Sequence, residues 1–297
     1  MNVLCVGGCG YIGALLVPQL LAEGHKVTVY DLQLFGDGHL PKDNQNLTII
    51  KGDVRDVDDL YGAAVDQDAI IWLASVSNNA MYGVNYEFTH SVNTCLTYFP
   101  VKRFIYASSA AVADPTSDYA KDKIYCEEKL KGTKAIIVRS ASVCGYSPRQ
   151  RFDLTVNMMI HDAARKGVIT VNGGLQKRSH VHIQDLCDFY KLLLTERDEF
   201  VCGQTFTVVA DNLSVMATAR EVVNVYVDRY IQIVTKPRSD NRSYVSSGDK
   251  ALVIGFAPKR NVRDAIQDLK IKFDSGYWPD SLTNPIFQNI CDLKPPL

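Results

Sequence analysis

A glycine-rich turn near the N-terminus constrains the fold of this chain more than any other feature. The turn, Gly7-Gly8-Cys9-Gly10-Tyr11-Ile12-Gly13, lies between the apolar run Val3–Val6 and the helix-like segment Ala14–Ala22. Glycines allow a tight turn and close packing of helix on strand, and the free N–H groups at a helix start can bind phosphate. Because a strand precedes the turn and a helix follows it, the motif predicts a dinucleotide-binding unit.

The rest of the N-terminal half repeats this alternation of short apolar runs and helical segments. The runs are apolar on both faces, as strands are when helices cover both sides of a parallel sheet. They are Val27–Tyr30, Leu47–Ile50, Ala69–Leu73, Phe104–Tyr106 and Ala135–Val138. The pattern predicts an α/β fold with a doubly wound parallel sheet of the Rossmann type.

The C-terminal half is less regular. It contains two further strand candidates, Thr205–Val209 and Ile231–Val234. Ser214 is a plausible N-cap for a helix from Val215 to about Val227, and Arg263–Leu269 has the pattern of a short helix. We expect these elements to form a smaller α/β domain.

Composition excludes several classes of protein. The chain has 297 residues, of which 46% are hydrophobic and 22% charged, and 32 basic residues balance 33 acidic ones to a net charge of −1. With this balance the chain as a whole exerts no electrostatic attraction on nucleic acid. No apolar run is long enough to span a membrane. The first residues lack the pattern of a signal peptide, and the 8 cysteines form no C-x-x-C pair. We therefore expect a cytoplasmic protein with reduced thiols.

Two aspartates follow strand candidates. Asp31 ends the run Val27–Tyr30, where a carboxylate can accept hydrogen bonds from ribose hydroxyls. No arginine stands near Asp31 to meet a 2′-phosphate, so the pattern favours NAD over NADP. Asp53 could accept from the adenine amino group, with the backbone of Val54 beside it. The alternative is a glycine turn with surface aspartates and no ligand.

Tyr119 and Lys123 have the spacing Y-x-x-x-K. On a helix these positions lie on one face, and a neighbouring ammonium lowers the pKa of a tyrosine from about 10 towards neutrality. Tyr119 is therefore a candidate general base for an alcohol proton. Ser109 follows the run Phe104–Tyr106 and could hydrogen-bond the reacting oxygen, because strand ends of a parallel sheet face the usual ligand crevice.

Together these residues resemble the extended short-chain dehydrogenase/reductase family, in the NAD-dependent epimerase/dehydratase branch that modifies nucleotide sugars. Further segments that resemble the family pattern are Leu73-Ala74-Ser75, Val92-Asn93, the stretch from Arg139 to Gly145, the stretch from Arg178 to Asp185, and Asn241-Arg242-Ser243-Tyr244.

The resemblance implies a set of ligand contacts. NAD would be bound by Gly7, Gly10, Tyr11, Ile12, Gly13, Asp31, Asp53, Val54, Leu73, Ala74, Ser75, Asn93, Ala107, Tyr119 and Lys123. The catalytic residues would be Ser109, Tyr119 and Lys123. The nucleotide-sugar substrate would be bound by Ser109, Asn157, Arg178 and Arg242.

The resemblance also implies an activity, hydride transfer at a sugar hydroxyl, at C4 by our expectation. A 4-epimerase is the leading prediction; a 4-dehydrogenase or 4-ketoreductase with net redox change and a non-catalytic dinucleotide-binding protein remain alternatives. The dehydratase branch has an Asp-Glu pair after its catalytic hydroxyl residue, and this chain has Ala110 and Ala111 there, which disfavours dehydration. We expect no metal site, although His180 and His182 form an H-x-H pair. A homodimer is left open.

The resemblance also implies two domains, one for each ligand. Residues 1–144 with 178–210 would form the NAD-binding Rossmann domain, and residues 145–177 with 211–297 the nucleotide-sugar-binding domain.

Overall fold

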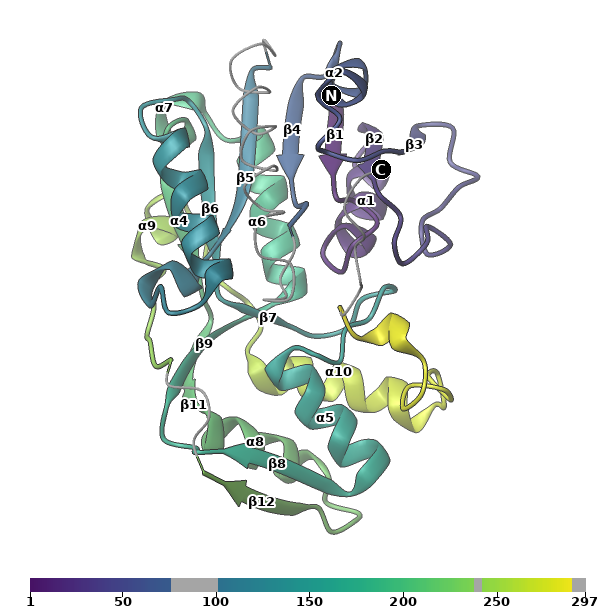
Figure 1. Cartoon of the computed structure of the whole chain (residues 1–297), viewed down its shortest axis with the longest axis vertical. Coiled ribbons are helices and arrows are strands. Elements are labelled where there is room, and N and C mark those ends of the chain that lie inside the picture. Colours follow the sequence, from purple (N-terminus) through teal and green to yellow (C-terminus); the bar gives the residue numbers. More distant parts are fainter. Residues whose placement is uncertain (76–100, 238–241, 290–297) are drawn as a thin grey trace. The chain divides into compact units, whose positions relative to one another are not determined.

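The structure is a computed structural model that describes residues 1–75, 101–237 and 242–289 (Figure 1). The chain forms two compact units. The first includes Met1–Arg139 and Phe189–Phe206, and the second Ser140–Asp188 and Thr207–Asn289. These units are defined by packing, whereas the two domains predicted above are defined by their ligands, so that division stays a prediction.

Seven strands form one sheet in the order β10-β6-β5-β4-β1-β2-β3. The pairs β3–β2, β2–β1, β1–β4 and β4–β5 are parallel. The order runs outward in both directions from the β1–β4 junction, which makes the sheet doubly wound and confirms the predicted fold class. The strands are β1 (Asn2–Val6), β2 (Lys26–Asp31), β3 (Leu47–Lys51), β4 (Ala69–Trp72), β5 (Arg103–Ser109), β6 (Ile136–Ser140) and β10 (Thr205–Val208).

Helices alternate with these strands along the chain, as a parallel sheet requires. Apolar side chains of α2 and α4 pack with strand residues such as Leu4, Tyr30 and Ile70 into one buried cluster. In that cluster the rings of Trp72 and Phe104 lie 6.3 Å apart. The helices are α1 (Gly13–Ala22), α2 (Val57–Ala64), α4 (Asp118–Leu130), α6 (Ile183–Thr195) and α7 (Asp198–Val201), with a 3-10 turn η2 (Ala110–Ala113) after β5.

The second unit has two small sheets and its own core. β9 lies between β7, which is parallel to it, and β11, which is antiparallel, while β8 and β12 form a parallel pair. Helices α5, α8 and α10 contribute to one apolar cluster with β8. The elements are β7 (Ser142–Cys144), α5 (Thr155–Lys166), β8 (Val168–Asn172), β9 (Lys177–His182), β11 (Asp211–Ser214), α8 (Val215–Val225), β12 (Gln232–Lys236), α9 (Asp249–Val253), α10 (Val262–Asp274) and η3 (Pro285–Phe287).

Local capping explains where two of these helices begin. α8 begins after Ser214, whose Oγ accepts from the Ala217 N–H at 3.1 Å, as predicted. α10 begins at Val262, one residue before the predicted Arg263–Leu269, where Asn261 and Asp264 form a capping box, and it continues past Leu269 to Asp274.

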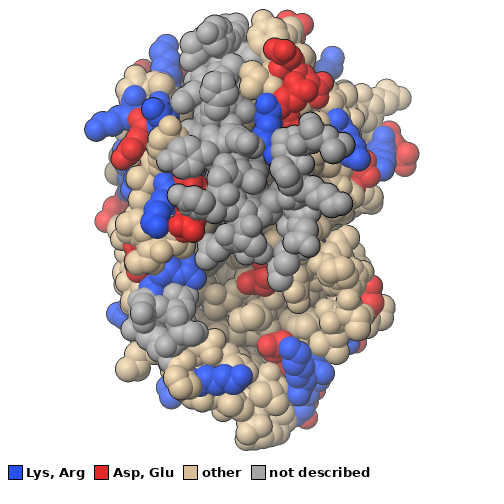
Figure 2. Space-filling model, in the orientation of Figure 1, with Lys and Arg blue, Asp and Glu red and all other residues tan. Residues whose placement is uncertain are grey.

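Charged side chains of both signs are interspersed over the face shown in Figure 2, in keeping with the net charge of −1. No helix within residues 1–75, 101–237 and 242–289 is both long enough and apolar enough to cross a bilayer.

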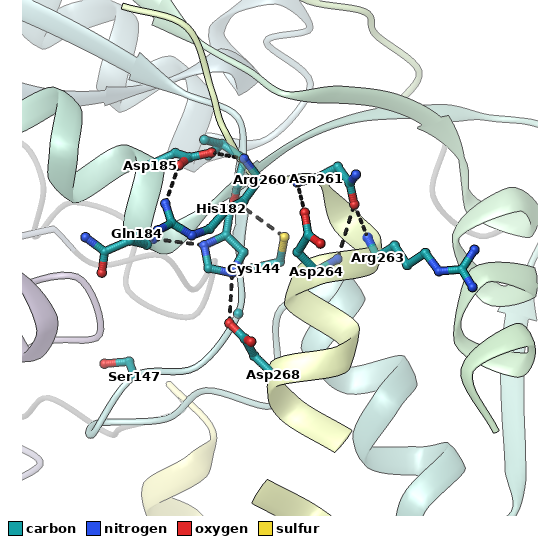
Figure 3. A network of polar contacts seen from close by, with 12 residues as sticks. Cys144, Ser147, His182, Gln184, Asp185, Arg260, Asn261, Arg263, Asp264 and Asp268 are labelled. Atoms are coloured by element: carbon teal, nitrogen blue, oxygen red, sulfur yellow. Dashed lines mark hydrogen bonds and ion pairs between the residues drawn. The ribbon is translucent and has the colours of Figure 1, made fainter. Parts of the chain in front are cut away.

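A buried carboxylate joins two segments of the second unit. Asp185, only 1% exposed, accepts from the backbone N–H groups of Lys259 and Arg260 at 2.9 and 2.7 Å (Figure 3). It also accepts from the Arg260 guanidinium at 2.7 Å. The start of α6 is thereby bonded to the segment that leads into α10.

We predict that Asp185→Ala lowers the free energy of unfolding by about 3 kcal/mol, because buried N–H donors lose a charged acceptor. Asp188→Ala is the matched control, since Asp188 is 31% exposed and lies 3.6 Å from the same guanidinium. It should cost less than about 1 kcal/mol. Urea unfolding of both variants measures the difference, and equal losses would contradict the prediction.

Candidate functional site

The glycine turn lies against the segment that follows β4. Gly7 has a φ of 82°, and a Cβ added there would lie 2.5 Å from the Ala74 nitrogen and 2.7 Å from its Cα. A Cβ on Gly13 would lie 2.6 Å from the carbonyl carbon of Gly8. Both positions therefore exclude any side chain, as the motif predicts.

Asp31 is bonded to this turn. Its carboxylate oxygens accept from the N–H groups of Cys9 at 2.9 Å and Gln33 at 2.7 Å. The turn leads directly into α1, where the first N–H groups of a helix lack acceptors within the helix. Tyr11 is buried and Ile12 half-buried at this helix start.

These features fit a dinucleotide. Among the residues that the structure describes, a Cβ on Gly10 would meet within 4 Å only the Gly7 carbonyl oxygen, at 3.2 Å, so the missing side chain leaves space over the turn. A phosphate could approach that space at the start of α1, and the fixed Asp31 carboxylate could accept from a ribose.

Asp53 and Val54 follow β3. The Asp53 carboxylate accepts from the backbone N–H and the Nε of Arg55, each at 2.9 Å. Burial alone would raise the pKa of Asp53, but the hydrogen bonds from Arg55 outweigh it and the pKa is lowered. The sequence did not indicate this Arg55 pairing. Val54 is buried, in the apolar cluster of the first unit.

The segment after β4 is held by backbone bonds. The N–H groups of Leu73 and Ala74 both donate to the Val6 carbonyl, at 2.8 and 3.0 Å, and Ser75 follows them. These bonds place Leu73 and Ala74 beside the glycine turn. Asn93, the other predicted contact in this part of the chain, lies outside the described residues.

Tyr119 and Lys123 lie on one face of α4, as their spacing predicts. The Lys123 Nζ lies 5.7 Å from the centre of the Tyr119 ring and donates to the Ala107 carbonyl at 2.7 Å. Burial lowers the pKa of Lys123 to about 8, and the nearby Cys126, Glu127 and Asp122 oppose this change. α4 starts at Ser117, whose Oγ accepts from the Ala120 N–H at 3.2 Å.

Two neighbouring serines end β5 with different partners. The Ser109 Oγ accepts from the Ala111 N–H at 3.2 Å and caps η2. Ser108 is buried and donates to Glu127, which in turn accepts from Arg139 Nε at 2.9 Å. Sequence reasoning missed Glu127, although it stands one helical turn after Lys123.

Of the predicted substrate residues, Ser109 lies in the first unit, and Asn157, Arg178 and Arg242 lie in the second. Asn157 is fully buried, and its amide accepts from the Gly145 N–H and donates to the Arg151 carbonyl, both at 3.0 Å. Arg178 is buried and donates to the backbone carbonyl of Arg242, so the structure brings these two arginine positions together.

The two histidines of the H-x-H pair have different surroundings on β9. The His182 Nδ1 accepts from the Gln184 N–H at 3.1 Å, so Nε2 holds the proton and faces Asp268 at 3.3 Å (Figure 3). Burial and the Arg178 guanidinium lower the pKa of His180 to about 4. No group of three metal-ligating side chains occurs among the residues that the structure describes.

We predict that Gly7→Ala destabilises the protein by at least about 2 kcal/mol more than Gly24→Ala. Both glycines have a positive φ, 82° and 84°, but within the described ranges no atom lies within 4 Å of a Cβ on Gly24. The control should therefore cost only about 1 kcal/mol for its backbone conformation. Denaturant unfolding of both variants measures this difference in the free energy of unfolding. Equal stability of the two variants would contradict the prediction.

A second prediction concerns Lys123. Its pKa is about 8 when folded and 10.5 ordinarily, so the unfolded chain binds more protons between these values and folding stability rises with pH there. The free energy of unfolding of the wild type, minus that of Lys123→Met, should rise by about 2 kcal/mol from pH 7 to pH 9.5. The contributions of the other titratable groups are the same in both proteins and cancel when the two free energies are subtracted. A difference that does not change with pH would refute the prediction.

The chain is similar to known proteins over most of its length. Residues 3–208 match the NAD dependent epimerase/dehydratase family. A relative in Sinorhizobium fredii, the uncharacterized protein y4nG, is 30% identical over 212 residues, which cover 62% of this chain and 51% of that protein. The chain thus spans about half the length of this relative. A UDP-glucose 4-epimerase of Lacticaseibacillus casei is 24% identical over 318 residues, covering 90% of this chain and 94% of that protein.

Solved structures agree on the fold. A double mutant of a dTDP-glucose 4,6-dehydratase from Streptomyces venezuelae, solved with NAD bound, superimposes with a TM-score of 0.82 at 20% identity. The match covers 94% of this chain and 98% of that chain. Because the family match extends from the glycine turn past Tyr119 and Lys123, the chain belongs to the NAD-dependent epimerase/dehydratase family.

Proposed function

We propose that this protein is a nucleotide-sugar 4-epimerase that binds NAD and transfers hydride at the C4 hydroxyl of the sugar. The observation that supports it most is the Tyr119 and Lys123 pair, with the Lys123 Nζ held on the Ala107 carbonyl and 5.7 Å from the Tyr119 ring. A buried cation at this distance favours the phenolate form that a general base needs.

Each residue has a defined part in the proposed reaction. Tyr119 takes the proton of the C4 hydroxyl and later returns it, while Ser109 donates a hydrogen bond to the same oxygen. Lys123 stabilises the phenolate and would hold the nicotinamide ribose. NAD, when bound, would supply the acceptor for the C4 hydride and the donor for its return. The sugar turns over between the two transfers, which inverts C4 without net oxidation.

The cofactor would be held by the glycine turn and its neighbours. The first N–H groups of α1 would bind the phosphates, with Asp31 on the adenosine ribose. Asp53 and Val54 would meet the adenine, and the segment from Leu73 to Ser75 would line the cofactor. Asn157, Arg178 and Arg242 would bind the nucleotide-sugar phosphates, since paired guanidinium groups suit a diphosphate.

Two observations favour epimerisation over elimination of water. Ala110 and Ala111, which follow Ser109, are buried and apolar, so these positions supply neither acid nor base. The Lacticaseibacillus casei relative, similar over nearly its whole length, is a UDP-glucose 4-epimerase.

The test is turnover of UDP-glucose, UDP-N-acetylglucosamine and dTDP-glucose with NAD, followed by NMR of the sugar. We expect the C4 epimer of at least one substrate, with no accumulation of NADH. Tyr119→Phe should lower kcat by about 100-fold or more and leave NAD binding unchanged. Tyr125→Phe, on the same helix, is the control and should match the wild type.

Other outcomes would overturn the proposal in identifiable ways. NADH in proportion to product would show a net dehydrogenase. NAD binding without turnover of any sugar would indicate a non-catalytic binding protein, and wild-type turnover in Tyr119→Phe would refute the assigned base.

A further inference from the structure

Glu127 is a nearly buried carboxylate on α4 that the proposed mechanism does not use. Its side chain is 10% exposed and stands one helical turn after Lys123. Arg139 Nε lies 2.9 Å from one of its oxygens and 3.2 Å from the other. Ser108 donates to the first of these oxygens.

These contacts form one of several links between α4 and β5. Lys123 Nζ donates to the Ala107 carbonyl at 2.7 Å and lies 3.4 Å from the Tyr106 hydroxyl oxygen. Glu127 accepts from Ser108, so successive residues of the strand are tied to the helix. The bond from Ser108 to α4 holds the end of the strand, and Ser109 is the next residue along it, so the bond fixes the backbone that carries Ser109.

We propose that Glu127 is a positioning residue that, through Ser108, holds Ser109 in a set place relative to Tyr119 and Lys123. This inference rests on the proposed function, which gives Ser109 and Tyr119 the same substrate oxygen. The connection between Ser109 and Tyr119 is short, because only η2 and a few residues separate β5 from α4.

Electrostatics supports the same assignment. Glu127 and Arg139 form an ion pair, and hydrogen bonding to Glu127 is the main cause of the raised pKa of Arg139. An ionised acceptor forms a stronger hydrogen bond with the Ser108 hydroxyl than a neutral one would. Together with Asp122 and Cys126, Glu127 also opposes the loss of the proton from Lys123.

Four variants test the proposal in the full-length protein. Glu127→Gln removes the charge and keeps a similar shape, and Ser108→Ala removes the hydroxyl. Ser108→Thr keeps a hydroxyl at this position and should retain the activity that Ser108→Ala loses. Glu128→Gln is the matched control, because this exposed neighbour on α4 undergoes the same change of charge.

Steady-state kinetics is the first measurement. Because small misplacements of reacting groups lower rates steeply, we expect Glu127→Gln and Ser108→Ala to lower kcat by about tenfold or more. KM for the sugar and the Kd for NAD should stay within about twofold, and Ser108→Thr and Glu128→Gln should resemble the wild type. Parallel losses in KM, or a wild-type kcat in both variants, would overturn the proposal.

Hydrogen exchange provides a measurement that does not need turnover. The Ala111 N–H donates to Ser109 Oγ, so its exchange reports the placement of Ser109. Exchange at Ala111 should be faster in Glu127→Gln and Ser108→Ala and unchanged in Glu128→Gln; unchanged exchange in all three would overturn the proposal. If the wild type turned over no sugar, the proposed function would fail while this measurement still decided the role of Glu127.

Discussion

The close approach of two backbone segments, at Gly7 and at Ala74, is the contact on which the ligand end of the first unit depends. The Val6 carbonyl accepts both the Leu73 and the Ala74 N–H groups, which brings the chain after β4 against the glycine turn. No side chain fits between them, since a Cβ on Gly7 would lie 2.5 Å from a backbone nitrogen. The carboxylate of Asp31 is held in turn by the backbone N–H groups of Cys9 and Gln33, so the predicted phosphate and ribose positions are set largely by backbone.

A second constraint is the burial of a cation. Lys123 is enclosed between α4 and β5, where burial disfavours its charged form and lowers its pKa to about 8. A carbonyl at 2.7 Å and carboxylates on the same helix compensate in part for the lost water. An ammonium group with a pKa close to neutral therefore lies beside the Tyr119 ring. Acid–base chemistry near neutral pH requires groups whose pKa values lie in this range. Stability is lower as a result, as is common at functional sites.

Much of the fold could be predicted because its signals are local. The apolar runs, the glycine turn and the Ser214 cap lie within a few residues of the elements they define, and the structure confirms these elements. α10 was underestimated at both ends, although the capping box at Asn261 and Asp264 was visible in the sequence. β5 extends beyond the predicted Phe104–Tyr106, from Arg103 to Ser109, because its last residues, Ala107, Ser108 and Ser109, are small or polar and carry no apolar signal.

The sequence by itself determined the strand–turn–helix start, the doubly wound α/β class and the placement of Tyr119 and Lys123 on one helical face, because each follows from periodicity or spacing along a short stretch. Only the tertiary structure decided that Ser108 bonds Glu127, that Asp53 accepts from Arg55 in its turn, and that Arg178 meets the backbone of Arg242. Most of these partners are distant in sequence or depend on which way a side chain turns. Such contacts are set by the packing of whole elements, and no local pattern encodes that packing.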